Sequence, residues 1–342
     1  MRSFAIGLVF IARIAFGQVP AGYYDGTEGL SGQLLRAELQ SIIDDHLEQS
    51  YASIWTHFQI TDVNPNGKVW DMYSDIPGGV PAYTYAFVSD QCGNYSSEGD
   101  CYNREHSFPK SWFNDAAPMV TDLFHIYPTD GYVNGKRSNY PFGEVNTPSW
   151  ISTNGSKLGN SSFPGYSGIV FEPIDEYKGD FARTYFYMMT RYMDEVSSWS
   201  CDMLTGNDLS AWAKELLLQW DDEDPVSQKE TDRNNAVYQI QQNRNPFIDH
   251  PEFAVLIWGL PTKIDDPNLY DLKVWYYDRN IHLESTDHII GTFKISTING
   301  IPLDQFILEG SSLSIPCALN AGIYIAIIET RNEIKTYKLI IL

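Results

Sequence analysis

Residues 101–110 read CYNREHSFPK, and residues 121–144 read TDLFHIYPTDGYVNGKRSNYPFGE. These two segments contain the densest cluster of side chains that can act as acids, bases or metal ligands. Around it, residues 60–180 are rich in glycine, proline, asparagine, serine and aromatic residues and contain few long periodic runs. This composition predicts loop-rich structure with short strands. Such loops carry functional sites more often than scaffold elements do.

Three side chains in this stretch suit metal-assisted hydrolysis. His106 is the natural base near neutral pH. Glu105 and Asn134 offer a carboxylate and an amide oxygen, the ligands that hard Mg²⁺ or Ca²⁺ prefers, and such a metal neutralises charge growing on a phosphoryl or acyl group. Neighbours on a regular strand point to opposite faces, so we expect an irregular backbone if Glu105 and His106 serve one phosphate. The alternative is a surface ion pair beside a packed histidine.

Cysteine usage predicts one small disulfide loop. Cys92 and Cys101 bracket a turn-rich stretch of eight residues, GNYSSEGD, and this spacing permits a disulfide. The loop would hold the segment directly before Glu105. A nucleophilic Cys101 is the alternative, and Cys201 and Cys317 have no evident partner.

Apolar periodicity predicts three long helices, over residues 31–49, 180–196 and 208–220. Asp180 is placed to cap the second. The acidic residues 221–224 follow the third, and we expect a solvated loop there, with a Ca²⁺ site as the alternative. Thr129 is placed to cap a short helix with Asn134 one turn inside and Asn139 near its end.

Other catalytic motifs are missing from the sequence. It contains no His-Glu-x-x-His zinc motif, no phosphate-binding Gly-Lys-Ser/Thr loop and no Gly-x-Ser-x-Gly elbow. Residues 62–67 (DVNPNG) copy the start of a calcium loop, but Tyr73 stands at the twelfth position, where the closing glutamate belongs. We therefore expect a plain turn there, with calcium as the alternative.

Composition and charge narrow the class of protein. The 342 residues suggest about two domains, and 43% hydrophobic residues exclude wholesale disorder. No apolar run reaches the ~18–20 residues of a membrane helix, so we expect no integral membrane segment. The net charge of -21 argues against a broad basic face for nucleic acid. It does not exclude an enzyme that contacts a polyanion at one metal site.

Four parts are predicted along the chain. Residues 1–17 read as a secretory signal, with Arg2, a short apolar run and a small-x-small cleavage site. Residues 18–262 form the catalytic domain, residues 263–269 a linker, and residues 270–342 an all-β domain, expected to be a small sandwich.

Several strings strongly resemble the endonuclease I family, in the family's order: NREH at 103–106, DLFHIYP at 122–128, VNGKRSN at 133–139 and PFGE at 141–144, with supporting matches GDFAR at 179–183 and NPFIDHP at 245–251. The resemblance covers roughly residues 20–258. Its members are secreted bacterial nucleases, not specific for the sugar, with a ββα-metal site. It implies an α+β fold of helices and short strands around a ββα-metal (His-Me finger) motif.

The resemblance also implies roles. His106 would be the general base, Glu105 and Asn134 would hold one Mg²⁺, with Ca²⁺ or Mn²⁺ as alternatives, and the products would carry 5′ phosphates. Many relatives have histidine in place of Phe124 and asparagine in place of His125. The role of His125 therefore stays open between a partner of the base, a spare base and a packed side chain.

Five residues are candidates for phosphate contact or for support of the site: Arg104, Asp122, His125, Arg137 and Asn139. The family's transition-state arginine is not aligned, so Arg104 and Arg137 are only candidates for that role.

The tail resembles a second family. Gly322-Ile323-Tyr324 and the closing KLIIL at 338–342 are similar to the C-terminal sorting domain of the type IX secretion system, a route of Bacteroidota. This implies that the type IX machinery exports the protein across the outer membrane. The alternative is an ordinary β-sandwich binding module.

The sequence as a whole indicates an exported Mg²⁺-dependent endonuclease for DNA and also RNA, with little sequence specificity. The rival hypothesis is a catalytically inactive surface adhesin or carbohydrate-binding protein built on a nuclease-like core. The intact Glu105, His106 and Asn134 favour the enzyme.

Overall fold

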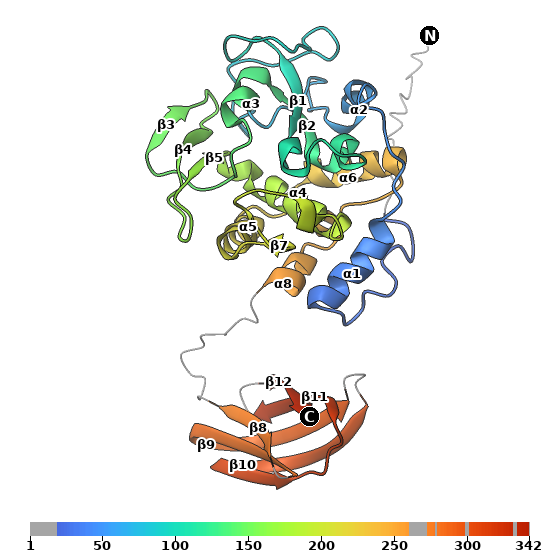
Figure 1. Cartoon of the computed structure of the whole chain (residues 1–342), viewed down its shortest axis with the longest axis vertical. Helices are drawn as coiled ribbons and strands as arrows, with labels where there is room; N and C mark the ends of the chain where they lie inside the picture. Colours follow the sequence, from blue (N-terminus) through green and yellow to red (C-terminus); the bar gives the residue numbers. More distant parts are fainter. Residues whose placement is uncertain (1–18, 260–271, 278, 298–300, 331–333, 342) are drawn as a thin grey trace, which may run out of the picture. The chain divides into compact units, whose positions relative to one another are not determined.

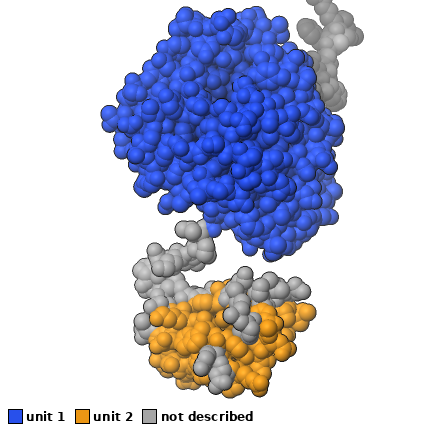
Figure 2. All heavy atoms as spheres, viewed as in Figure 1, with its two compact units in different colours: residues 1–260 blue, residues 261–342 orange. Residues whose placement is uncertain are grey.

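The computed structural model describes residues 19–259, 272–277, 279–297, 301–330 and 334–341. The predicted signal and linker, residues 1–17 and 263–269, lie outside the described residues. The chain divides into two compact units, Met1–Leu260 and Pro261–Leu342 (Figure 2). Each unit has its own buried apolar cluster.

Unit 1 mixes helices with short strands, as predicted. The described residues of this unit form eight α-helices: α1 Gly32–Ile43, α2 Ile54–Thr61, α3 Gly131–Arg137, α4 Lys178–Arg191, α5 Ala211–Glu223, α6 Gln228–Gln241, α7 Pro246–Asp249 and α8 Glu252–Trp258. Its strands are β1 Tyr102–His106, β2 Ile126–Asp130, β3 Pro148–Ile151, β4 Lys157–Asn160, β5 Ile169–Glu172, β6 Leu204–Thr205 and β7 Asp208–Leu209. Every residue of α4 is buried, so this helix forms the centre of the core (Figure 1).

The three long helices exist, with different ends. α1 stops at Ile43, short of the predicted residue 49, and α4 begins at Lys178, which places Asp180 in the first turn and not at the cap. α5 continues through the acidic run to Glu223. The solvated-loop prediction for that run is wrong, because Asp221 pairs with the buried Arg183 at 2.8 Å.

The supporting motifs of the sequence lie at a junction of core helices. Arg183 of α4 makes a two-pronged ion pair with Glu230 of α6, with Nε–Oε1 and Nη2–Oε2 distances of 2.6 and 2.9 Å. At Gly179 an added Cβ would lie 2.0 Å from the carbonyl oxygen of Asp224, so only glycine fits. Asn245 caps α7 and donates to the carbonyl oxygen of Arg183. These contacts of Gly179, Arg183 and Asn245 therefore hold the core helices together.

Two paired strands and a helix form the centre of the chemically rich stretch. β1 and β2 are antiparallel, in a regular register from Tyr102 opposite Asp130 to His106 opposite Ile126. α3 follows β2 directly (Figure 1). Asp130 caps this helix by accepting a hydrogen bond from the Val133 amide, so the predicted cap at Thr129 is one residue early.

Unit 2 consists of antiparallel strands, as predicted: β8 Lys273–Tyr277, β9 Asn280–Thr297, β10 Pro302–Pro316, β11 Gly322–Thr330 and β12 Ile334–Ile341. Hydrogen bonds join them into one five-stranded sheet of order β10-β9-β11-β12, in which β8 also pairs with β9. In the part of the chain that the structure describes, no helix is long and apolar enough to cross a membrane.

Candidate active site

One face of β1 packs against α3. Asn103 and Glu105 are two residues apart and therefore share this face. Across from them, Asn134 and Arg137 are three residues apart on α3, which places both on one side of the helix. The Asn134 side-chain nitrogen donates to Asn103 Oδ1 at 2.7 Å. Arg137 Nη1 lies 3.0 Å from Glu105 Oε1. The strand and helix thus bring the predicted ligands Glu105 and Asn134 to one interface.

Glu105 is a buried carboxylate, only 2% exposed. Besides Arg137, the Tyr73 hydroxyl donates to Glu105 Oε1 at 2.9 Å. Burial raises the pKa of Glu105, while the Arg137 charge and the Tyr73 hydrogen bond oppose that rise. Both described contacts go to Oε1, which leaves Oε2 as the oxygen that can bind a cation.

Arg137 is buried as well, and its guanidinium is committed to the protein. It donates to the carbonyl oxygens of His106 and Ser107 and lies over the Phe142 ring at 4.7 Å. With 1% exposure it has no free edge for a phosphate. Its contacts fix the end of β1 and the Glu105 carboxylate, so Arg137 is a positioning residue.

His106 lies on the opposite face of β1. Its Nε2–H donates to the Val120 carbonyl oxygen at 3.1 Å, because a carbonyl only accepts. That bond selects the tautomer whose Nδ1 keeps a lone pair. Burial, followed by the nearby His125 and the cations Lys110 and Arg104, lowers the pKa of His106 to about 3. The imidazole is therefore neutral, the form in which histidine accepts a proton.

An exposed aromatic and a cation lie beside His106. The Tyr51 ring stacks on the imidazole with centroids 6.0 Å apart and is itself 39% exposed. The Arg104 guanidinium lies 3.7 Å from the Tyr51 centroid and 4.6 Å from that of Trp55. Arg104 is half-buried, unlike Arg137. It is therefore the arginine of the two that a substrate phosphate can reach.

The remaining candidates lie elsewhere. His125 is fully buried, donates to the Met119 carbonyl oxygen and has its ring 5.3 Å from that of His106. It packs beside His106 and is closed to solvent. Asp122 is fully buried and accepts hydrogen bonds from Tyr187, Tyr192 and Gln241, so it cannot contact phosphate. Asn139 lies past the end of α3, is exposed and contacts Ser111.

The backbone at Glu105 and His106 is regular, contrary to the condition derived from the sequence. The strand register is unbroken through His106. The two neighbouring side chains therefore diverge onto the two faces of β1, one toward α3 and one toward Tyr51 and Val120.

The predicted disulfide between Cys92 and Cys101 is confirmed, with a Cα–Cα distance of 5.7 Å. It ends one residue before β1. A bonded Cys101 excludes the nucleophile alternative. Cys201 and Cys317 carry free thiols.

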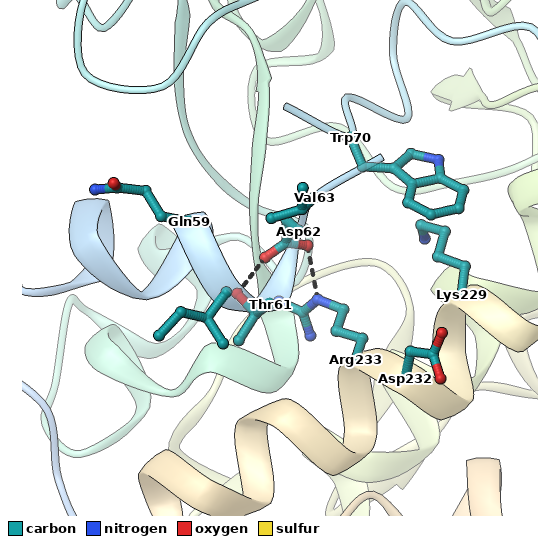
Figure 3. A pocket seen from close by; sticks show the side chains of 9 residues that line it. Gln59, Thr61, Asp62, Val63, Trp70, Lys229, Asp232 and Arg233 are labelled. Atoms are coloured by element: carbon teal, nitrogen blue, oxygen red, sulfur yellow. Dashed lines mark hydrogen bonds and ion pairs between the residues drawn. The ribbon is translucent and has the colours of Figure 1, made fainter. Parts of the chain in front are cut away.

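The calcium-like string at residues 62–67 is a turn, as expected. Asn64 Oδ1 accepts hydrogen bonds from the amides of Asn66 and Lys68. Asp62 accepts from Arg233 Nε at 2.8 Å and from Thr61, and Figure 3 shows both contacts inside a pocket between α2 and α6. With its carboxylate committed to these donors, Asp62 is not arranged as a calcium ligand, and the pocket contains none of the predicted site residues.

The donor set at β1 and α3 fits a hard divalent cation. Asn134 donates its side-chain nitrogen to Asn103, so its Oδ1 is the atom that can accept a cation. Among the described residues no three His, Cys, Asp or Glu side chains converge as a metal cluster. One carboxylate and one amide suit Mg²⁺, which keeps several waters and binds substrate phosphate.

The sequence did not reveal three partners of these groups. Asn103 shares the face of Glu105, and the two-residue period of a strand is a signal that finds it. Tyr73 lies 32 residues before its partner Glu105, and Tyr51 lies 55 residues before its partner His106. No local sequence pattern marks either tyrosine.

Comparisons with known proteins show which family the chain belongs to. The Endonuclease I family model matches residues 31–252. The extracellular ribonuclease of Bacillus amyloliquefaciens is 37% identical over 246 residues, 69% of this chain and 78% of that protein. The extracellular ribonuclease of Bacillus subtilis (strain 168) is 35% identical over 244 residues, again 69% and 78% of the two chains. A periplasmic deoxyribonuclease of Aeromonas hydrophila is 27% identical over 139 residues, 38% of this chain and 48% of that one. The chain therefore belongs to the Endonuclease I family and is an endonuclease.

Proposed function

We propose that this endonuclease is secreted, depends on one divalent metal ion, and hydrolyses phosphodiester bonds of DNA and RNA with little sequence specificity. The proposal rests on the arrangement of side chains at the end of β1. A neutral histidine lies on one of its faces, and a carboxylate–amide pair lies on the other.

Opposite faces suit the chemistry. In an in-line displacement at phosphorus, the attacking and leaving oxygens lie on opposite sides of the phosphorus. The base belongs with the attacking water and the metal with the leaving oxygen. Adjacent residues on a regular strand point to opposite faces, so His106 and Glu105 would approach a phosphate at the end of β1 from two different sides. The irregular backbone that we expected at Glu105 and His106 is therefore unnecessary.

His106 acts as the general base in this proposal. The Val120 carbonyl holds its Nε2–H, and Nδ1 takes a proton from the attacking water. Glu105 Oε2 and Asn134 Oδ1 would hold Mg²⁺, with Ca²⁺ or Mn²⁺ as alternatives. When bound, the cation stabilises charge that develops on the phosphate and on the departing 3′ oxygen. Departure of the 3′ oxygen produces a 5′ phosphate.

The two arginines divide their work. Arg137 positions Glu105 and the end of the strand from inside the protein. Arg104, half-buried on Tyr51 and Trp55, contacts the substrate phosphate. Backbone contacts of this kind carry no sequence information. The net charge of -21 should make substrate binding weak and sensitive to salt.

The substrates and the location follow the names of the relatives. Relatives are named ribonuclease and deoxyribonuclease, and extracellular or periplasmic. We assign residues 1–17 to a secretory signal and residues 18–262 to the catalytic domain. Residues 263–269 serve as a linker, and residues 270–342 act as a sorting domain for the type IX secretion machinery of Bacteroidota.

Plasmid nicking with and without EDTA tests the proposal. Purified protein with Mg²⁺ should convert supercoiled DNA to nicked and linear forms, and EDTA should stop the reaction. End-labelling should find 5′ phosphates. Cleavage that persists in EDTA would refute the metal-dependent mechanism, and absence of cleavage with Mg²⁺, Ca²⁺ and Mn²⁺ alike would favour the inactive-adhesin hypothesis.

A further inference from the structure

A second side of α3 carries an aromatic platform, which we define as Tyr95, Tyr132 and Trp150 with Lys136. The Tyr132 ring centroid lies 6.4 Å from those of both Tyr95 and Trp150. Lys136, one turn after Tyr132, has its Nζ 5.1 Å from the Tyr132 centroid and 5.9 Å from that of Trp150. Three elements meet here: the disulfide loop, α3 and β3 (Figure 1).

The platform is built in advance of any ligand. Tyr95 lies directly on the helix, because a Cβ at Gly131 or Gly135 would be 2.6 Å from its ring carbon or its hydroxyl oxygen. The Cys92–Cys101 disulfide closes the loop that carries Tyr95. In the same loop, Glu98 accepts two hydrogen bonds from Thr153, which follows β3. A rigid surface loses little entropy on binding.

Its exposure and charge suit an anionic ligand with flat groups. Tyr95 is 37% exposed, and Tyr132, Trp150 and Lys136 are half-buried. None of the ion pairs among the described residues includes Lys136. In a chain of net charge -21, an amine without a carboxylate partner is a favourable place for phosphate.

We propose that this platform stacks unpaired bases of the substrate next to the cleavage site, with Lys136 on a neighbouring phosphate. The inference rests on the proposed nuclease function, because α3 carries both the platform and Asn134. Base faces are free in single strands and covered by neighbours in a duplex, so the preferred substrate class is single-stranded nucleic acid. Stacking contacts the base and not the sugar, so DNA and RNA are both accepted.

Equilibrium binding tests the platform without cleavage. The full chain carries His106→Ala, EDTA is present, and fluorescence anisotropy measures Kd for a short labelled single strand, as DNA and as RNA, and for a hairpin duplex. Trp150→Ala should weaken single-strand binding by roughly 5- to 150-fold and leave duplex binding nearly unchanged. Trp275→Ala, which removes an exposed tryptophan from unit 2, is the matched control and should change neither. Lys136→Gln should reduce the salt slope of single-strand binding by about 0.7.

Two further variants separate stacking from folding. Trp150→Phe keeps a stacking face and should retain most of the affinity, and Tyr132→Leu should weaken single-strand binding if Trp150→Ala fails to fold. Unchanged single-strand binding in Trp150→Ala, or equal losses for single strand and duplex, would overturn the platform. These results do not depend on whether wild-type protein nicks plasmid, so the platform and the nuclease mechanism can fail independently.

Discussion

The two faces of β1 differ in how their charges are held. On the α3 face, Glu105 and Arg137 are both buried and neutralise each other, and Tyr73 adds a hydrogen bond. On the other face, Arg104 lies half-buried on aromatic rings. A buried charge depends on its partner, because removal of one member leaves the other uncompensated. The α3 face therefore holds the proposed metal ligands in a rigid frame, and the Tyr51 face carries the arginine that a phosphate can reach.

His106→Ala should produce the largest change and act on chemistry alone. Loss of a positioned base typically costs ~10²–10⁴-fold in rate. The measurement is initial nicking rate at saturating Mg²⁺, with circular dichroism to check the fold. His125→Ala should not mimic it at the chemical step, since that ring is fully buried. A near-wild-type rate for His106→Ala would move the base role to another residue.

A comparison of Arg137→Met with Arg104→Met tests whether the two faces of β1 depend differently on their charges for stability. Arg137→Met leaves the buried Glu105 carboxylate without its cationic partner. It should therefore lower the free energy of unfolding by about 3–5 kcal/mol. Arg104→Met removes a half-buried cation and should cost less than about 1 kcal/mol. Urea unfolding of both variants measures the difference. Equal stability losses would show that the charges on the two faces of β1 are held alike.

Asn134→Ala tests the proposed metal site on the α3 face. It removes one proposed ligand and leaves no buried charge without its partner. We expect the Mg²⁺ concentration for half-maximal activity to rise by roughly 10- to 100-fold, with partial rescue by excess Mg²⁺. Glu105→Ala should act in the same direction but also destabilise the fold, because Arg137 loses its partner. Asn139→Ala is the matched control on an exposed asparagine. If Mg²⁺ titrations of Asn134→Ala and Glu105→Ala superimposed on that of the wild type, the metal site would lie elsewhere.

Truncation to residues 18–262 should produce the smallest change. Both faces of β1 belong to unit 1, and the two units have separate apolar clusters. The truncated protein should nick plasmid as the full chain does, while a cell that makes it should fail to deliver it outside. An insoluble or inactive truncated protein would mean that the tail completes the core, and the sorting-domain proposal would fall.

Local sequence was sufficient for several features of the fold. Two cysteines around a turn-rich stretch predicted the disulfide. The pattern of residues 270–342 predicted an all-β domain, and the described strands β8 to β12 confirm it. The adjacency of Glu105 and His106 implied opposite faces in any regular strand, since the side-chain period of a strand is two residues.

The tertiary structure was needed to show which polar groups remain accessible at the surface. Arg104 and Arg137 are equivalent in the sequence, yet one is half-buried at the surface and the other is enclosed. Asp122 matched a family motif, and its carboxylate is satisfied by Tyr187, Tyr192 and Gln241, all more than 60 residues away. A local pattern specifies backbone periodicity. Burial and hydrogen-bond partners come from distant segments, because a compact core encloses a charged group only where such segments meet to neutralise it.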